Sequence, residues 1–191
     1  GLEMIAQQNQ VTLSSVFHGI WGLLLQRYND TKDVVFGSVV SGRPAELEGS
    51  EKMVGLFINT IPVRICHKEA QTFSQIIKQF QQNMMESGKY HFLSLADIQM
   101  LTPLGKNLIH HIIAFENYPI TEELAGGEGE QLVSIVETEG FEQTNYDFNI
   151  GVIPGKELKV KFGYNSIAYQ ASDIQRIELH LKQIAEQVVS N

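Results

Sequence analysis

The sequence predicts an α/β fold, in which helices pack against a mixed, mostly antiparallel sheet. Three observations lead to this prediction. Apolar residues recur at helical spacing in three segments, and runs rich in β-branched residues lie between these segments. Near the C-terminal end, the turn Pro154-Gly155-Lys156 separates two such runs, which implies an antiparallel hairpin.

The first expected helix runs from Thr12, a residue suited to the N-cap, to about Tyr28. Because its apolar residues cover well over half of its circumference, we expect it to be buried on more than one face. These residues are Leu13, Val16, Phe17, Ile20, Trp21, Leu23, Leu24 and Leu25. Asp33 to Val40 then forms a central strand, since β-branched residues dominate this segment.

A second strand is expected over Leu56 to Ile65, where Pro62 indicates an edge position or a bulge. Thr72 and Gln75 have the spacing of a capping box, which predicts the start of an amphipathic helix that ends near Gly88. The next expected elements are a short helix over Leu95 to Met100 and a strand over Leu108 to Phe115.

The last third of the chain begins with an acidic, glycine-rich segment, Thr121 to Glu130, which predicts a surface loop. Three strands are then expected, over Leu132 to Glu137, Tyr146 to Ile153 and Leu158 to Tyr164. Ser172 and Gln175 form a second capping-box pattern. The apolar stripe behind it predicts an amphipathic terminal helix and consists of Ile174, Ile177, Leu181, Ile184 and Val188.

Composition fits one globular domain over residues 1–191, with 43% hydrophobic residues. The net charge of −8 argues against nucleic acid or an anionic membrane as the main partner, because both require clustered positive charge. No apolar run is long enough to span a bilayer. A single cysteine, Cys66, fits a reducing compartment, and we expect a cytoplasmic protein.

The first residues have a helix-like composition but do not begin with methionine. This start is equally consistent with a cut through a longer polypeptide and with a tag remnant before an independent domain.

The loop between the first two strands, together with the second strand, is the leading functional candidate, because function tends to lie on loops held by rigid elements. Arg43 in this loop either binds an anion or fastens the loop through hydrogen bonds to carbonyls, and we favour the second role. The amide of Asn59 is directed either at a ligand or at the neighbouring loop backbone. Ser41 lacks the glycine two residues before it that a hydrolase nucleophile elbow requires.

The histidines do not complete a catalytic site. His110 and His111 are adjacent in an apolar strand, so their side chains point to opposite faces and do not serve one site. We expect one of them to face the core and the other the solvent. His91 follows Tyr90 in a loop without a nearby carboxylate, which favours a solvated side chain. No complete catalytic or metal-binding constellation is evident from the residues.

Two blocks of the chain, Asp33 to Pro44 and Met53 to Arg64, resemble the condensation domains of nonribosomal peptide synthetases. The first block contains Ser41, Gly42 and Arg43. The second matches the family pattern IGxFxNTxxxR at Gly55, Phe57, Asn59, Thr60 and Arg64. The resemblance spans nearly the whole chain. It implies a fold like one lobe of chloramphenicol acetyltransferase.

The resemblance also explains the absence of catalytic residues. The family carries its HHxxxDG motif in an N-terminal lobe, and His110-His111 is a false match because Phe115 and Glu116 stand at the Asp and Gly positions. The chain is therefore expected to be the C-terminal lobe alone, without the lobe that carries the catalytic histidines. In such a domain, an amine on one carrier-tethered substrate attacks the thioester of the other and forms an amide.

From this resemblance we expect the eight motif residues to shape a substrate tunnel rather than to catalyse the reaction. We expect the loop from Ser41 to Met53 to lie beside the tunnel floor and a strand near Asn145 to Ile153 to cross to the other lobe. The expected partners are the N-terminal lobe and peptidyl carrier domains that bear 4'-phosphopantetheine, with no cofactor or metal on this chain. We also expect an exposed apolar face where the other lobe is absent.

Two alternatives remain at this point. One is the corresponding lobe of an epimerization domain, which shares the fold, although the two blocks look more like those of peptide-forming members. The other is a module that docks carrier proteins without catalysis. The amino acids that are joined cannot be read from the sequence.

Overall fold

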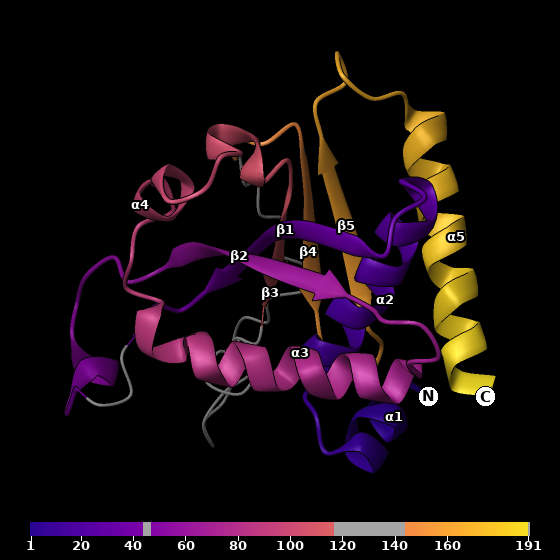
Figure 1. Cartoon of the computed structure of the whole chain (residues 1–191), viewed down its shortest axis with the longest axis horizontal. Coiled ribbons are helices and arrows are strands. Elements are labelled where there is room, and N and C mark those ends of the chain that lie inside the picture. The colour runs from indigo at the N-terminus through magenta and orange to yellow at the C-terminus, as the bar shows by residue number, and fades with distance from the viewer. Residues whose placement is uncertain (44–46, 117–143, 191) are drawn as a thin grey trace, which may run out of the picture.

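The computed structural model describes residues 1–43, 47–116 and 144–190, which fold around a five-stranded sheet of order β2-β1-β3-β4-β5 (Figure 1). Its strands are β1 (Asp33–Val40), β2 (Asn59–Cys66), β3 (Ile112–Phe115), β4 (Phe148–Ile153) and β5 (Lys159–Tyr164). The two outer pairings are antiparallel and the two inner ones are parallel. The described sheet is thus mixed, as predicted. However, it has as many parallel as antiparallel pairings and is not mostly antiparallel. Parallel neighbours need long connections and leave no hairpin signal in the sequence.

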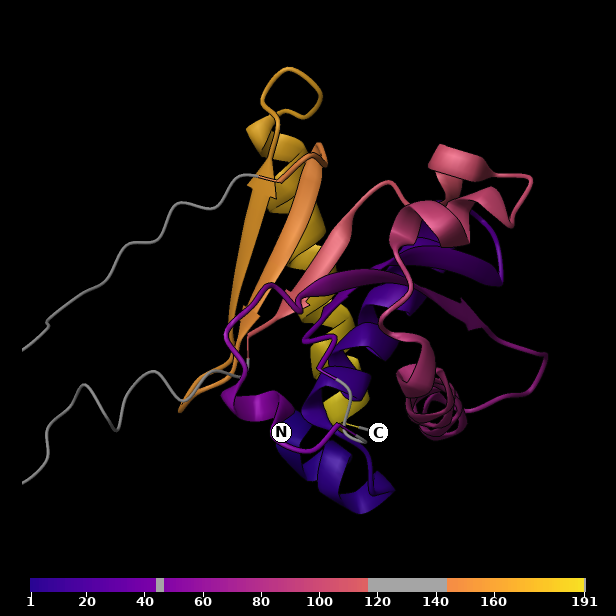
Figure 2. The same ribbon diagram turned by 90° about the vertical axis from the view of Figure 1, so that its left-hand side faces the viewer.

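One face of the sheet is covered by four helices, with α2 in contact with the other three (Figure 1). They are α1 (Leu2–Asn9), α2 (Leu13–Tyr28), α3 (Phe73–Ser87) and α5 (Ala171–Ser190). The side view shows α5 running along β4 and β5 (Figure 2). Thr12 caps α2 by accepting a hydrogen bond from the Ser15 N–H, and Thr72 and Gln75 form the predicted capping box of α3.

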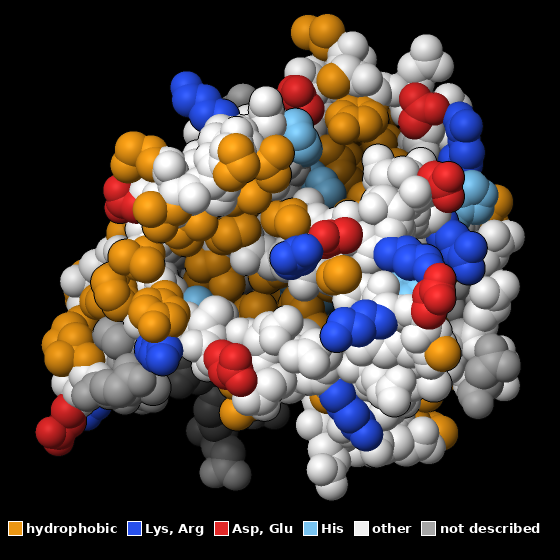
Figure 3. Space-filling view, viewed as in Figure 1, with side chains coloured by type: hydrophobic (Ala, Val, Ile, Leu, Met, Phe, Trp, Pro, Cys, Tyr) orange, Lys and Arg blue, Asp and Glu red, His pale blue; other side chains and the backbone are white. Residues whose placement is uncertain are grey.

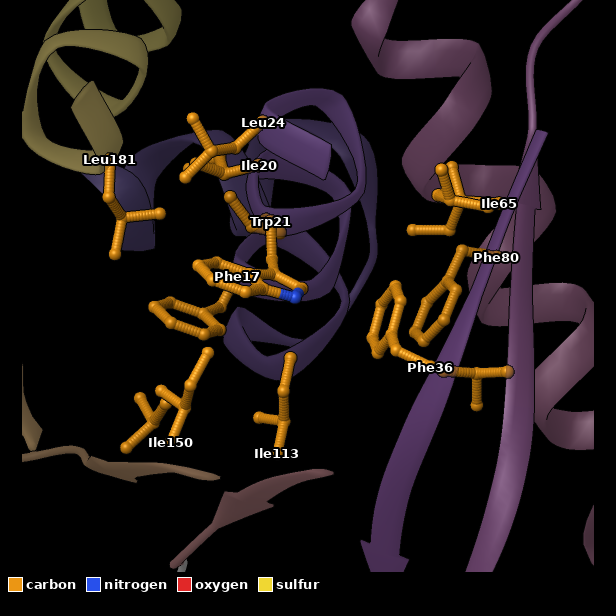
Figure 4. Packing of buried hydrophobic residues seen from close by; sticks show 14 of the residues in the cluster. Phe17, Ile20, Trp21, Leu24, Phe36, Ile65, Phe80, Ile113, Ile150 and Leu181 are labelled. Atoms are coloured by element: carbon orange, nitrogen blue, oxygen red, sulfur yellow. The ribbon is translucent and has the colours of Figure 1, made fainter. Parts of the chain in front are cut away.

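The main core lies between α2 and this face of the sheet (Figure 4). As predicted, α2 is buried on several sides, because β1, α3 and α5 surround it. It contributes Phe17, Ile20, Trp21 and Leu24, which pack against side chains from every described strand and from α3 and α5. Each aliphatic or aromatic side chain of this size stabilises the fold by about 1.5–3 kcal/mol when fully buried.

The opposite face of β1 and β3 is covered by a smaller unit, α4 (Leu95–Met100), and by a 3-10 turn η3 (Gly105–Leu108). Leu108, Ile109 and Ile112 form a second buried cluster there. Two further 3-10 turns, η1 (Ser50–Lys52) and η2 (Gly88–Tyr90), lie in the loops at the start of β2 and the end of α3.

Several expected boundaries are wrong. The second strand begins at Asn59 instead of Leu56, because its partner β1 ends at Val40, directly opposite Asn59. The third strand begins at Ile112, after η3. Ser172 lies inside α5 and does not cap it, since the carboxylate of Asp173 accepts the hydrogen bond from the Gln170 N–H instead. The expected loop over 121–130 and strand over 132–137 lie outside the described residues.

The C-terminal hairpin is confirmed, since β4 and β5 pair antiparallel. The expected crossing of the 145–153 segment to another lobe is wrong for Phe148–Ile153, because β4 lies inside this sheet with a partner on each side.

Pro62 lies on an edge strand, as predicted. It faces Gly37 of β1, whose N–H donates to His111 on the other side of the strand. The nitrogen of Pro62 therefore points away from the sheet, so the proline costs no hydrogen bond of the ladder. Among the described residues, no helix is long and apolar enough to cross a membrane.

Exposed apolar side chains gather around α4 and the segment that leads into β2 (Figure 3). We call this surface the apolar patch; it comprises Met53, Val54, Leu56, Ile58, Tyr90, Phe92, Met100, Leu101 and Leu104. The two runs of the patch are held together by hydrogen bonds from Asn59 to the backbone of His91 and Leu93. An exposed apolar face is thus present as expected.

Candidate functional site

The loop between β1 and β2 is closed by a tight backbone contact at Gly42. This residue has φ +62°, and a Cβ atom built on it would lie 1.9 Å from the carbonyl oxygen of Phe57. Only glycine fits both the left-handed backbone and this approach. The two arms of the loop therefore meet directly after β1 and just before β2.

Arg43 fastens the same loop. One guanidinium nitrogen donates hydrogen bonds to the carbonyl oxygens of Ser50 and Met53, the latter at 3.1 Å. The guanidinium carbon also lies 4.3 Å from the centroid of the Phe57 ring, which gives a cation–π contact. The favoured role, fastening the loop to carbonyls, is confirmed.

Asn59 joins β2 to the loop after α3. Its side-chain N–H groups donate to the carbonyl oxygens of His91 at 2.8 Å and Leu93 at 2.6 Å, and its Oδ1 accepts from the Thr60 N–H at 2.9 Å. The amide of Asn59 thus binds the backbone of the loop after α3, in which His91 lies 32 residues away in the sequence. This contact fixes the position of His91.

The remaining motif residues lie apart from this cluster. Arg64 stands at the far end of β2 and makes two hydrogen bonds to the carboxylate of Asp33, at 2.7 and 2.5 Å. These hydrogen bonds lower the pKa of Asp33. Both side chains are largely exposed, so the ion pair contributes little stability. Gly55 is exposed, and its φ is not in the left-handed region.

A pocket of about 550 Å³ lies where the carboxyl ends of β1, β3 and β4 meet the first turn of α2. The carboxyl edge of parallel strands is a common place for ligands in α/β proteins. Ser41, Gly42 and Arg43 line one side of this pocket. Ser38 at the end of β1 continues this side, and four other segments contribute Ser14, Met84, His91, Phe115 and Pro154 among others.

A buried histidine lies directly behind the pocket. The Nδ1 of His18 is 2.7 Å from the Ser14 carbonyl oxygen, and its Nε2 is 3.0 Å from Ser38 Oγ. A carbonyl only accepts, so Nδ1 carries the proton and Nε2 accepts from the Ser38 hydroxyl. Burial between the rings of Phe36 and Phe80 lowers the pKa of His18 to about 4, which keeps the ring neutral.

Sequence reasoning missed this His18–Ser38 pair, because Ser14 and His18 are one helical turn apart but Ser38 comes from another element. His18 and Ser38 are both almost completely buried. With its polar atoms satisfied, the pair is part of the scaffold that shapes the pocket.

His91 is half-buried at the pocket, so the expectation of a solvated loop histidine is wrong. Its Nε2 lies 3.0 Å from the hydroxyl of Ser87. Burial lowers the pKa of His91 below its ordinary value. The hydrogen bonds from Asn59 to the loop are what bring it there, and only the folded structure reveals them.

His110 and His111 separate as predicted: His110 is exposed, whereas His111 points into the core. The Nε2 of His111 accepts a hydrogen bond from Trp21 Nε1 at 2.8 Å. Burial lowers the pKa of His111 to about 4, so its ring is neutral at pH 7. Within the described ranges, no group of three or more metal-binding side chains is present.

The model of the family described as "Condensation domain" matches residues 1–191. The chain is 47% identical over 189 residues to gramicidin S synthase 2 of Brevibacillus brevis, covering 98% of this chain and 4% of that protein. It is 46% identical over 192 residues to tyrocidine synthase 2 of Brevibacillus parabrevis, covering 100% of this chain and 5% of that protein.

Solved structures show the same fold. The first condensation domain of the CDA synthetase superimposes with a TM-score of 0.72 at 18% identity, covering 97% of this chain and 41% of that one. A four-domain nonribosomal peptide synthetase bound to AMP and glycine gives a TM-score of 0.75 at 18% identity, with coverage of 98% and 16%. The chain spans less than a tenth of the length of these two curated relatives.

Proposed function

The chain belongs to the condensation domain family, and on that premise we propose that it is the C-terminal lobe of a nonribosomal peptide synthetase condensation domain. In the complete domain, two carrier proteins present substrates as phosphopantetheine thioesters. The amine of one substrate attacks the thioester carbonyl of the other. An amide bond forms, the carbon–sulfur bond breaks, and the thiol of the donor carrier is released.

The observation that carries the proposal is the extent of the match. The family model covers all 191 residues, yet the chain covers 41% of a solved condensation domain. The HHxxxDG pattern is absent from the sequence, since Phe115 and Glu116 follow His110-His111 at the Asp and Gly positions. We therefore assign the base that accepts the proton of the attacking amine to the other lobe.

In this proposal the loop and strand between Ser41 and Arg64 are the wall of the substrate tunnel. Gly42, Arg43 and Asn59 support it, because each one fastens a segment that lines the pocket: Gly42 and Arg43 the loop after β1, and Asn59 the loop of His91. A wall of this kind raises the reaction rate by holding the two tethered groups in register, rather than by accepting a proton. The apolar patch is assigned to contact with the rest of the synthetase.

An assay of condensation with two loaded carriers tests the proposal. The chain alone and the complete two-lobe domain containing it are compared by the release of the amide product. We expect turnover by the two-lobe domain and none by the chain alone. Turnover by the chain alone contradicts the assignment of the catalytic base to the other lobe. If the two-lobe domain binds carriers without turnover, the chain is a docking module instead.

A further inference from the structure

The two edge strands of the sheet differ in how their outer backbone is protected. Edges of soluble proteins are usually blunted by a proline, a bulge or a covering element. On β2 the proline is Pro62, and the outward N–H of Thr60 already donates to the Asn59 side chain. On β5 no residue is a proline, and the register with β4 is unbroken from Lys159 to Tyr164.

Two hydrogen bonds fix the orientation of the β5 backbone. The carbonyl oxygen of Val152 in β4 points to the β3 side, where it accepts from the Glu116 N–H at 2.8 Å. Directly after β5, the Asn165 N–H donates to the Asp147 carbonyl oxygen at 2.8 Å. Because hydrogen-bonding direction alternates along a strand, every second residue of β5 turns its N–H and C=O groups away from the sheet. These residues are Val160, Phe162 and Tyr164.

The outward groups of β5 have no partner within the described part of the chain. No described residue forms a hydrogen bond with them, and β5 is the outermost strand on its side of the sheet (Figure 2). Donors and acceptors therefore alternate along the edge without interruption. The group that matches such a row is the backbone of another extended segment.

The side chains of β5 give this edge an apolar side and a basic side. Val160 and Phe162 lie on the side of the helices, half-buried against the main core. Lys159 and Lys161 lie on the opposite side and are exposed. Neither lysine takes part in an ion pair among the described residues, although the carboxylate of Glu116 lies on the same side.

This distribution favours an acidic strand over a second copy of the chain. Two β5 edges paired with each other would gather the lysines of both copies on one face, and like charges on neighbouring strands are destabilising. A strand with an acidic residue at every second position would face Lys159 and Lys161 with opposite charge. Its intervening apolar residues would lie beside Val160 and Phe162.

We propose that the outer edge of β5 binds an extended segment of another protein domain, in which acidic and apolar residues alternate, and that this segment adds to the sheet as a further strand. Backbone hydrogen bonds hold the segment, and Lys159 and Lys161 select it by charge. The inference does not depend on the proposed function, because it uses only the geometry and the charges of the sheet.

Amide hydrogen exchange of the free chain, followed by NMR, tests whether the edge is open. The outward amides of Val160, Phe162 and Tyr164 should exchange at least about tenfold faster than the amides of Lys161 and Gly163, which face β4. Equally slow exchange of both sets would show that the edge is already paired, and it would overturn the proposal. So would protection of the outward amides that rises with the concentration of the chain, because the occupant is then a second copy.

The probe for binding is an acetylated and amidated peptide in which glutamate and valine alternate, and the same peptide with lysine in place of glutamate is its control. We expect Kd to be at least about fivefold lower for the acidic peptide, as two cross-strand charge pairs predict. The net charge of −8 works against this preference, so bulk attraction does not produce it. Equal or reversed affinities, or protection of amides outside β5, would contradict the inference.

Charge reversal tests the selection. In the double variant Lys159→Glu and Lys161→Glu, the basic peptide should bind more tightly than the acidic one. Lys78→Glu with Lys106→Glu makes the same change in net charge at exposed positions of α3 and η3, and it should keep the preference for the acidic peptide. An unchanged preference in the first variant, or a reversed one in the second, would show that the β5 lysines do not choose the partner.

A proline tests the use of the backbone. Val160→Pro removes one outward donor and spares the hydrogen bonds to β4, as Pro62 does on β2. Val160→Ala is the matched control, since it shortens the side chain and keeps the N–H. We expect the acidic peptide to bind Val160→Pro about fivefold more weakly than Val160→Ala. Equal affinities would exclude strand addition. If Val160→Pro does not fold, Tyr164→Pro and Tyr164→Ala make the same comparison at the end of the strand.

Discussion

At the scale of single residues, three of the motif positions of this chain act by joining backbone segments. Gly42 allows the two arms of one loop to touch, Arg43 fastens that loop to itself, and Asn59 binds the loop that carries His91. Each of these roles uses a property that few other residues share: a missing Cβ, a forked set of donors, or a short amide. Arg64 differs, because its partner is an exposed carboxylate.

Replacement of Gly42 by alanine tests the contact with Phe57. Gly42 and Gly49 both have positive φ, but a Cβ on Gly49 meets no atom within 4 Å. Gly49→Ala therefore reports backbone strain alone, about 1 kcal/mol. We expect Gly42→Ala to lower the free energy of unfolding by at least about 2 kcal/mol more than the control, because the backbone has to move. Urea denaturation measures both, and equal losses would show that the close approach is not required.

At the scale of elements, the sequence predicted local features better than features that depend on distant partners. The caps of α2 and α3 were predictable, since capping residue and first turn lie within four residues of each other. The start of β2 was not, because it is set by the end of β1. The capping box at Ser172 was misplaced because Asp173, one residue on, caps the backbone instead.

The candidate site shows the same division. Arg43 was predicted to bind carbonyls because its partners lie in its own loop. The partners of Asn59 were left open, since they come from the end of a separate helix. The pocket could not be predicted, because five segments meet there only after the sheet has formed. His91 carried no signal in its sequence neighbourhood.

The buried His18 of α2, which is hydrogen-bonded to Ser38 of β1, predicts that the free energy of unfolding depends on pH. Burial lowers the pKa of His18 from 6.5 to about 4, so the folded state binds fewer protons than the unfolded state between these values. The stability that the neutral His18 contributes is fully present above the unfolded pKa of 6.5. It is lost as the pH falls toward the folded pKa of about 4. The slope is about 1.4 kcal/mol per pH unit for one histidine. His111, whose pKa is also lowered to about 4, adds a second slope of the same sign.

In His18→Gln, the pH dependence of the unfolding free energy between pH about 6 and about 4.5 should therefore fall by at most about half, because His111 and His91, whose pKa values burial also lowers, keep their contributions. The exposed substitution His110→Gln is the control for the removal of a histidine outside the core. Denaturant titrations across this range make the comparison. A wild-type slope in His18→Gln would show that this histidine is not held neutral by the fold.

At the scale of the whole molecule, two surfaces of different character lie at opposite faces of β1. The face of the sheet that carries the helices is covered, and α2 is enclosed by the sheet and its neighbouring helices. Among the described residues, the other face carries the small cluster under α4, and the apolar patch extends from it toward solvent (Figure 3). Exposed apolar patches of this kind are typical of surfaces that contact a protein, a membrane or a ligand.

Charge placed on the patch should reduce non-specific association of the chain. Leu56 and Leu101 are 91% and 83% exposed, so the double variant Leu56→Asp and Leu101→Asp has little cost in stability. We expect severalfold weaker binding of an apolar fluorescent dye and less self-association in light scattering. Ile167→Asp is the control, since Ile167 is 95% exposed but lies in the loop before α5. Dye binding that is unchanged in the double variant would contradict the assignment.

The outward nitrogen of Pro62 has a consequence for how the chain avoids pairing with foreign strands. An unpaired strand edge is a template on which a foreign strand can add. At the middle of β2 this template lacks a donor, because a proline stands where an outward N–H would be. We expect the β2 edge to resist strand exchange with other protein chains, so that a residue inside the motif strand protects the chain against misassembly.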